Sequence, residues 1–273
     1  RGLGNRQRVI MQSHDHKHIN QDKFADSAGV PWAGRSFESN GYADDDGSAN
    51  PELIKALAAF AEGQVTIDSV IDRIRESRLL VPLVANLGES EVGAHGQVVD
   101  KSADLAIVTV KGPDGQTAMP VFSSVDAMKR WNPEARPVPS EPVKVALAAA
   151  SELTNRIVLD PGSETEFVIR RPAIAAIAQS IAWKSPEEIP AVHEAFSKSI
   201  EGENDVFAFA LMQGDPLARL LSAELVVLLR VRQGLEKEQV EEMLERVTTR
   251  WSESEVLAKL VDSMTLKLVP AAN

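Results

Sequence analysis

The clearest alternation of apolar and turn-forming positions lies in residues 105–131. A β-branched run ends at Val110, a turn-forming Gly-Pro-Asp-Gly sequence follows at 112–115, and a second apolar run covers 117–122. Such runs on either side of glycine and proline are typical of antiparallel strands joined by a tight turn. The pattern predicts a hairpin that leads into a helix, which begins at Ser123 or Ser124, where a hydroxyl can cap free backbone N–H groups.

Upstream, the apolar residues recur at helical spacing. Asn50-Pro51-Glu52 has the composition of a helix start, and Gly63 that of a helix end, so we predict a helix between them and a second one over 66–78. Leu79 to Ala85 reads as a buried strand, in which Pro82 favours an edge position or a bulge. Downstream, 157–159 and 167–169 predict a second hairpin, followed by a helix from Pro172.

The C-terminal part has a different pattern of apolar and charged residues. The pattern predicts a helix over 187–200, strands over 206–212 and 224–232, a charged amphipathic helix over 235–251 and a last strand over 264–269. This α-β-β-α-β order resembles a small ferredoxin-like sandwich. The predicted fold class is therefore α+β, with an N-terminal mixed sheet packed by helices and a C-terminal ferredoxin-like α+β sandwich.

Three segments follow from these patterns. Residues 1–50 are polar, rich in glycine and aspartate and without period, which predicts a flexible N-terminal arm with the true start near Met11. Residues 51–184 form the predicted N-terminal domain. The sequence Ser-Pro-Glu-Glu-Ile-Pro marks a boundary, and residues 187–273 form the predicted C-terminal domain.

Composition narrows the function classes. The net charge of −11 disfavours a surface for phosphate backbones, so we expect no nucleic-acid partner. The absence of cysteine excludes thiolate catalysis, disulfides and cysteine-based metal sites. No apolar run reaches the roughly 18 residues of a membrane span, and no signal peptide is visible, so we expect a cytoplasmic protein without membrane contact.

Motifs that would carry chemistry are incomplete. Alternate histidines at 14–18 could share a metal ion, but they lie in an unpatterned segment. The acidic turn at 44–46 lacks the acids that a calcium loop needs at its first and twelfth positions, and the glycines between 88 and 96 match no phosphate-binding motif. Capping explains Ser124, and His193 fits a helix surface. We therefore predict no metal, no cofactor and no catalytic residues.

Two groups of residues remain as candidate binding sites. An exposed tryptophan beside cations suits an acidic peptide or ligand, and Arg170 with Arg171 stands at a helix N-terminus that could receive an anion. The alternative readings are a tryptophan that covers the core and arginines that are simply solvated. The first group consists of Lys129, Arg130, Trp131 and Arg136.

Three phrases carry a family resemblance. LLVPLVA, DLAIVTVKGPDGQTAMPVFSSVDAMKRWNPEARPVP and RIVLDPGSETEFVIRRPAIAAIAQ resemble, in order and spacing, the SseB family in its actinobacterial form. The resemblance covers roughly residues 31–270. It implies an N-terminal SseB-type domain followed by a C-terminal SseB-like one, and it implies no catalytic residues.

The first functional hypothesis is a non-enzymatic cytoplasmic binding or regulatory protein with an unknown protein partner, which it contacts through the Lys129–Arg136 region. The second is a self-associating structural protein, a homo-oligomer joined through an open edge strand of the C-terminal sheet. The third is an enzyme whose site combines Arg170, Arg171 and Asp160. This last hypothesis requires the three residues to converge in one pocket.

Overall fold

The computed structural model describes residues 42–86, 104–113, 115–152 and 154–271. The histidine string at 14–18, the glycine loop at 88–96 and predicted arm residues 1–41 lie outside these ranges. Within the described ranges, every helix is too short or too polar to cross a bilayer.

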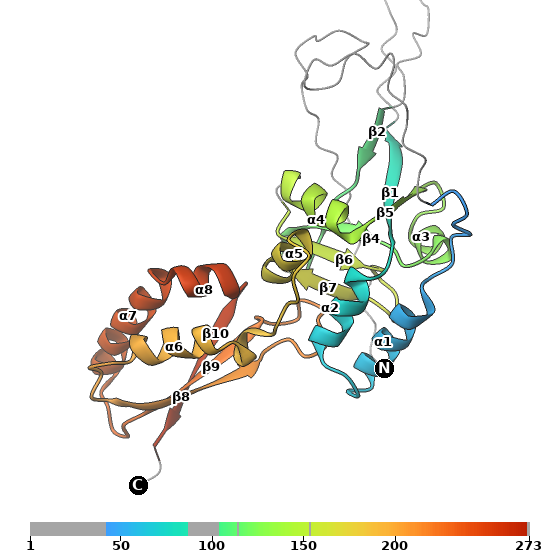
Figure 1. The fold of residues 1–273 in the computed structure, drawn as a ribbon. Coiled ribbons are helices and arrows are strands. Elements are labelled where there is room, and N and C mark those ends of the chain that lie inside the picture. Colours follow the sequence, from blue (N-terminus) through green and yellow to red (C-terminus); the bar gives the residue numbers. More distant parts are fainter. Residues whose placement is uncertain (1–41, 87–103, 114, 153, 272–273) are drawn as a thin grey trace, which may run out of the picture.

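The chain alternates helices and strands in two groups, which occupy separate regions in Figure 1. The helices are α1 (Pro51–Ala61), α2 (Ile67–Arg75), α3 (Val125–Trp131), α4 (Pro142–Ser151), α5 (Arg171–Ala178), the 3-10 turn η1 (Pro186–Glu188), α6 (Pro190–Ser199), α7 (Lys237–Ser252) and α8 (Glu255–Leu260). The strands are β1 (Leu79–Asn86), β2 (Asp104–Ile107), β3 (Val110–Lys111), β4 (Thr117–Val121), β5 (Arg136–Ser140), β6 (Arg156–Leu159), β7 (Phe167–Arg170), β8 (Val206–Gln213), β9 (Leu225–Val231) and β10 (Met264–Pro270).

The described part of the N-terminal domain contains two sheets, of order β2-β1-β5 and β3-β4-β6-β7. A backbone bridge between Leu80 and Phe122 joins them. The edge position expected from Pro82 is wrong, because β1 is the central strand of its sheet. Leu80 N–H donates to the carbonyl of Phe122, on the side of β1 that also pairs with β2. The nitrogen of Pro82 faces this same side, but pairing with β2 begins only at Leu83, so no acceptor of a described strand lies opposite the proline. The proline therefore removes no ladder hydrogen bond.

The first predicted hairpin is also corrected in part. Only β3 pairs with β4 across the predicted turn, whereas β2 joins the other sheet through β1. The helix start is confirmed, because the Ser124 hydroxyl accepts from Ala127 N–H at 3.1 Å. The second hairpin is confirmed as β6 and β7, and Asn50 caps α1 by accepting from Glu52 N–H.

Residues 45–48, at the end of the segment predicted as an N-terminal arm, lie against the N-terminal domain. The Arg78 guanidinium binds the Asp45 carboxylate, with 2.6 Å from Nη2 to Oδ1, and also donates to the carbonyl of Ser48. This partner holds the pKa of Asp45 below its usual range. Val125 N–H donates to the carbonyl of Gly47 at 2.9 Å, so residues 45–48 are fixed from two sides.

The C-terminal domain is a three-stranded mixed sheet of order β10-β9-β8, with α6, α7 and α8 on one face (Figure 1). β8 pairs with β9 antiparallel and β10 pairs with β9 parallel. Its core includes Phe196, Leu229, Val247 and Trp251, whose indole N–H donates to Ser199 Oγ at 2.7 Å. The predicted α+β class is confirmed in both domains. The sheet has one face packed on helices and one that the described helices leave uncovered.

Candidate functional site

The two predicted anion-binding arginines lie at the junction of the domains. Arg170 ends β7 and is only 6 % exposed. Its guanidinium binds two carboxylates of the C-terminal domain, at 2.7 Å from Asp215 and at 3.2 Å from Asp262. It also donates to Ser263 Oγ and to the carbonyl of Ser222. The anions that face Arg170 are thus side chains of the same chain.

Arg171 makes a second set of contacts across the junction. Its guanidinium donates to the carbonyls of Ala258 and Val261 at 2.7 and 2.8 Å. These carbonyls lie at the C-terminal end of α8, where backbone acceptors have no partner within the helix and a cation interacts favourably with the helix dipole. Arg171 therefore caps a helix of the other domain.

The loop that joins β8 to β9, residues 214–224, reaches into the N-terminal domain. Ala218 is buried within the core of that domain, and its carbonyl accepts from Val168 N–H of β7 at 2.7 Å. Ala218 and Leu220 both have left-handed φ angles, of 49° and 56°, which side chains rarely adopt. Asp215 supports this shape, because its carboxylate accepts from Leu220 N–H at 2.8 Å. The loop covers the edge of β7 and holds the domains in place.

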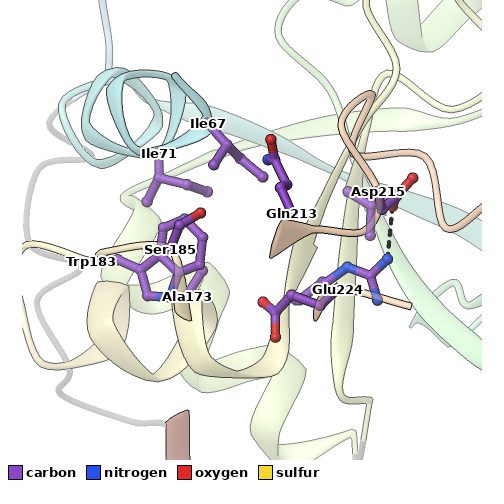
Figure 2. A pocket seen from close by; sticks show the side chains of 10 residues that line it. Ile67, Ile71, Ala173, Trp183, Ser185, Gln213, Asp215 and Glu224 are labelled. Carbon is purple, nitrogen blue, oxygen red and sulfur yellow. Dashed lines mark hydrogen bonds and ion pairs between the residues drawn. The ribbon is translucent and has the colours of Figure 1, made fainter. Parts of the chain in front are cut away.

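A small cavity lies inside this junction (Figure 2). In Figure 2, Ile67 and Ile71 of α2 and Trp183 of the linker line one side, and Asp215 and Glu224 line the other. The space open to the centres of water molecules is about 20 Å³, which is room for one or two waters. Trp183 Nε1 and Glu224 Oε1 are buried without a protein hydrogen-bond partner, so ordered water is the expected occupant.

Glu224 is the most perturbed acid of this site. Burial, with a smaller contribution from the neighbouring Asp262 carboxylate, raises its pKa to about 7. A hydrogen bond from Asp262 N–H to Glu224 Oε2, at 2.6 Å, and the charge of Arg170 oppose the shift. Burial also raises the pKa of the nearby Glu187. The junction therefore contains a carboxyl group that titrates near neutral pH.

The residues of the hypothetical enzyme site do not converge. Asp160 follows β6 at the turn of the β6–β7 hairpin, whereas Arg170 stands at the open end of the same hairpin, opposite Arg156. The Asp160 carboxylate accepts from Ser123 N–H and Oγ, at 2.8 and 2.6 Å, and from Thr165 Oγ1 at 3.1 Å. Asp160 is thus buried by hydrogen bonds that fix the start of α3, away from the arginines.

The other predicted contact region lies around α3. Lys129, Arg130 and Arg136 are exposed, and among the described residues none of them forms an ion pair. Trp131 is half-buried, with its ring centroid 5.2 Å from that of Phe122, and it packs on two apolar clusters. The tryptophan therefore covers the core, while the cations remain accessible beside it.

A further surface, which the sequence analysis did not assign, is the uncovered face of the C-terminal sheet, here called the outer face. Side chains of the outer face alternate along each strand with those that pack on the helices. The outer face consists of Ala208, Ala210, Met212, Val226, Leu228, Arg230, Thr265, Lys267 and Val269. Six of these nine residues are apolar. The signal in the sequence was the run VFAFALM, which is apolar at every position. A strand with one solvent-exposed face normally alternates apolar and polar residues.

Comparison with known proteins places one part of the chain in a family. No curated protein and no solved structure matches the chain. Residues 53–176 match the family model described as the SseB protein N-terminal domain. This range runs from α1 into α5 and includes both sheets of the N-terminal domain. Residues 53–176 therefore form an SseB protein N-terminal domain.

Proposed function

We propose that the chain is a non-enzymatic, cytoplasmic binding or regulatory protein, and that its partner is a protein that docks on the outer face of the C-terminal sheet. The observation that carries this proposal is the apolar character of that face, which no described helix covers. Met212 is 51 % exposed, and Phe207, at the bulge near the other end of β8, is 56 % exposed. Contiguous exposed apolar patches on folded proteins mark interaction sites.

The charges of the outer face indicate the chemistry of the partner. Arg230 and Lys267 are exposed, and among the described residues neither forms an ion pair. No acidic residue belongs to the outer face, although the whole chain carries a net charge of −11. Complementary potentials favour specific association. A partner segment that presents apolar and acidic side chains fits this surface.

Crosslinking tests this proposal. A photo-crosslinking residue in place of Met212 is expected to capture a defined protein from native lysate, whereas one in place of Glu245, exposed on α7, captures none. Reversal of both cations, R230E with K267E, is expected to lower the captured yield about tenfold, which corresponds to about 1.4 kcal/mol of binding free energy. Equal capture from positions 212 and 245, or a yield that charge reversal leaves unchanged, would contradict the proposal.

The exposed cations near α3 support a second contact surface. Asp126 and Glu134 lie close in sequence and reduce its net positive charge, so we expect a smaller contribution from it. The variant K129E with R136E leaves Trp131 and the core intact. It is expected to change the free energy of unfolding by less than about 0.5 kcal/mol, as is usual for surface substitutions. If this surface contacts the partner, the variant weakens binding of the captured protein in a titration; unchanged affinity would remove the surface from the proposal.

A further inference from the structure

β8 is an edge strand of the C-terminal sheet. It pairs with β9 on one side, over Val206–Val231 to Gln213–Leu225, and no other described strand pairs with it. The backbone groups of 207–213 that face away from β9 form no backbone hydrogen bond with another described segment. An edge of this kind presents a row of unpaired donors and acceptors that a further strand can complete.

The two edges of this sheet differ in how they are protected. β10, the opposite edge, contains Lys267 and Pro270, and charged residues and proline are the usual means by which an edge strand avoids further pairing. β8 has the sequence VFAFALMQ, which contains no charge and no proline. Its one irregularity is a bulge at Phe207, and the strand is regular from Ala208 to Gln213. β8 therefore carries neither of these two protections, although the turn η1 lies close to it.

We propose that β8 pairs antiparallel with β8 of a second copy of the chain, so that the two C-terminal sheets form one continuous six-stranded sheet. An antiparallel pair of identical strands has two-fold symmetry, so each outward N–H of one strand meets an outward carbonyl of the other. A second copy is the occupant because an uncharged strand is complementary to itself without any opposing charge. Two chains of net charge −11 repel each other, and a contact without acidic side chains adds least to that repulsion.

This pairing uses the edge of the sheet and is independent of the proposed partner on its outer face. It would place the outer-face rows of both copies side by side, because the pleat continues across the new strand pair. The partner surface would then be doubled, with Met212 of each copy near the junction.

Sedimentation equilibrium of the full chain tests the proposal. Ala210 is exposed on the outer face in the regular part of β8, so A210K introduces like charges on opposed strands without entering the core. We expect the unsubstituted chain to dimerise and A210K to raise the dissociation constant about tenfold or more. T249K, at an exposed position of α7, makes the same change of charge and is expected to dimerise like the unsubstituted chain.

A second position keeps the test decisive. A208K is expected to repeat the effect of A210K, and circular dichroism of both variants shows whether the sheet is retained. Hydrogen exchange is expected to slow at the β8 amides as concentration rises. A chain that stays monomeric at about 100 µM, a range in which weak dimers form, would overturn the proposal. A dimer that folded A210K and A208K both retain would overturn it as well, whereas the crosslinking result at Met212 would stand.

Discussion

Replacing Arg170 with methionine is expected to lower the free energy of unfolding by about 3–5 kcal/mol, the usual cost of removing one partner from a buried ion pair. The side chains of Asp215 and Asp262 are 3 % and 6 % exposed, so the substitution leaves two carboxylates with little solvent and without their main counter-charge. Arg156 lies 3.7 Å from Asp262 and compensates only one of them. Urea unfolding measures the loss, and we expect the C-terminal domain to unfold first, as a separate transition.

The matched control is R232M. Arg232 pairs with Asp205 at 2.8 Å, but its side chain is 54 % exposed. Solvent screening limits such a pair to about 0–1 kcal/mol. A triple variant, R170M with D215N and D262N, removes the stranded charges and is expected to recover part of the loss. If R170M and R232M cost the same, the arginine junction does not hold the domains together.

The substitution E224Q is expected to stabilise the protein at high pH. The pKa of Glu224 is about 7 in the folded chain against an ordinary value of 4.5, so the folded state keeps a proton that the unfolded state releases between these values. The contribution of Glu224 to the stability of the unsubstituted chain therefore falls by about 1.4 kcal/mol for each pH unit from 4.5 to 7, and by about 3 kcal/mol in all. Glutamine is neutral throughout, and its carbonyl oxygen can accept from Asp262 N–H.

Urea unfolding of both proteins at several pH values between 4.5 and 8 tests this expectation. The difference in free energy between E224Q and the unsubstituted chain is expected to grow with pH and to level above pH 7. All other ionisable groups are common to both proteins, so their contributions largely cancel in this difference. E245Q, at an exposed position of α7, is the control with a flat difference. If the difference in unfolding free energy between E224Q and the unsubstituted chain did not change with pH, the pKa of Glu224 in the folded chain would be ordinary.

The local elements were predictable because their signals are short-range. Asn50 and Ser124 satisfy N–H groups two and three residues away, and the β6–β7 hairpin closes over a seven-residue turn. The assignment of β2 and β3 to different sheets was not predictable, because it depends on which strands of the folded domain have an unpaired edge for each of them. The edge position predicted from Pro82 was wrong for the same reason. A strand can be central in its sheet and still have one residue without a backbone hydrogen-bond partner on one side.

The junction of the domains was recognised only as two arginines. Their charge suggested an anion, and the sequence pattern does not reveal that Asp215 and Asp262, 45 and 92 residues away, supply it. The loop residue Ala218 gives no signal at all, because alanine has no preference for a left-handed φ. The outer face of the C-terminal sheet was within reach, since a strand that is apolar at consecutive positions needs cover on both sides or a partner.

The docking of residues 214–224 onto the N-terminal domain decides whether that domain is complete without the sequence that follows it. The family match ends at residue 176, yet Trp183 and Ala218 complete the apolar core of that part of the chain, and the carbonyl of Ala218 satisfies a β7 amide. A fragment cut at the end of the family match would expose the side of its last strand and lose three buried core residues, Ile177, Trp183 and Ala218. The segment that the family model covers is therefore smaller than the segment that folds as a unit. Part of the apolar core of the SseB N-terminal domain is supplied by residues that follow the family match.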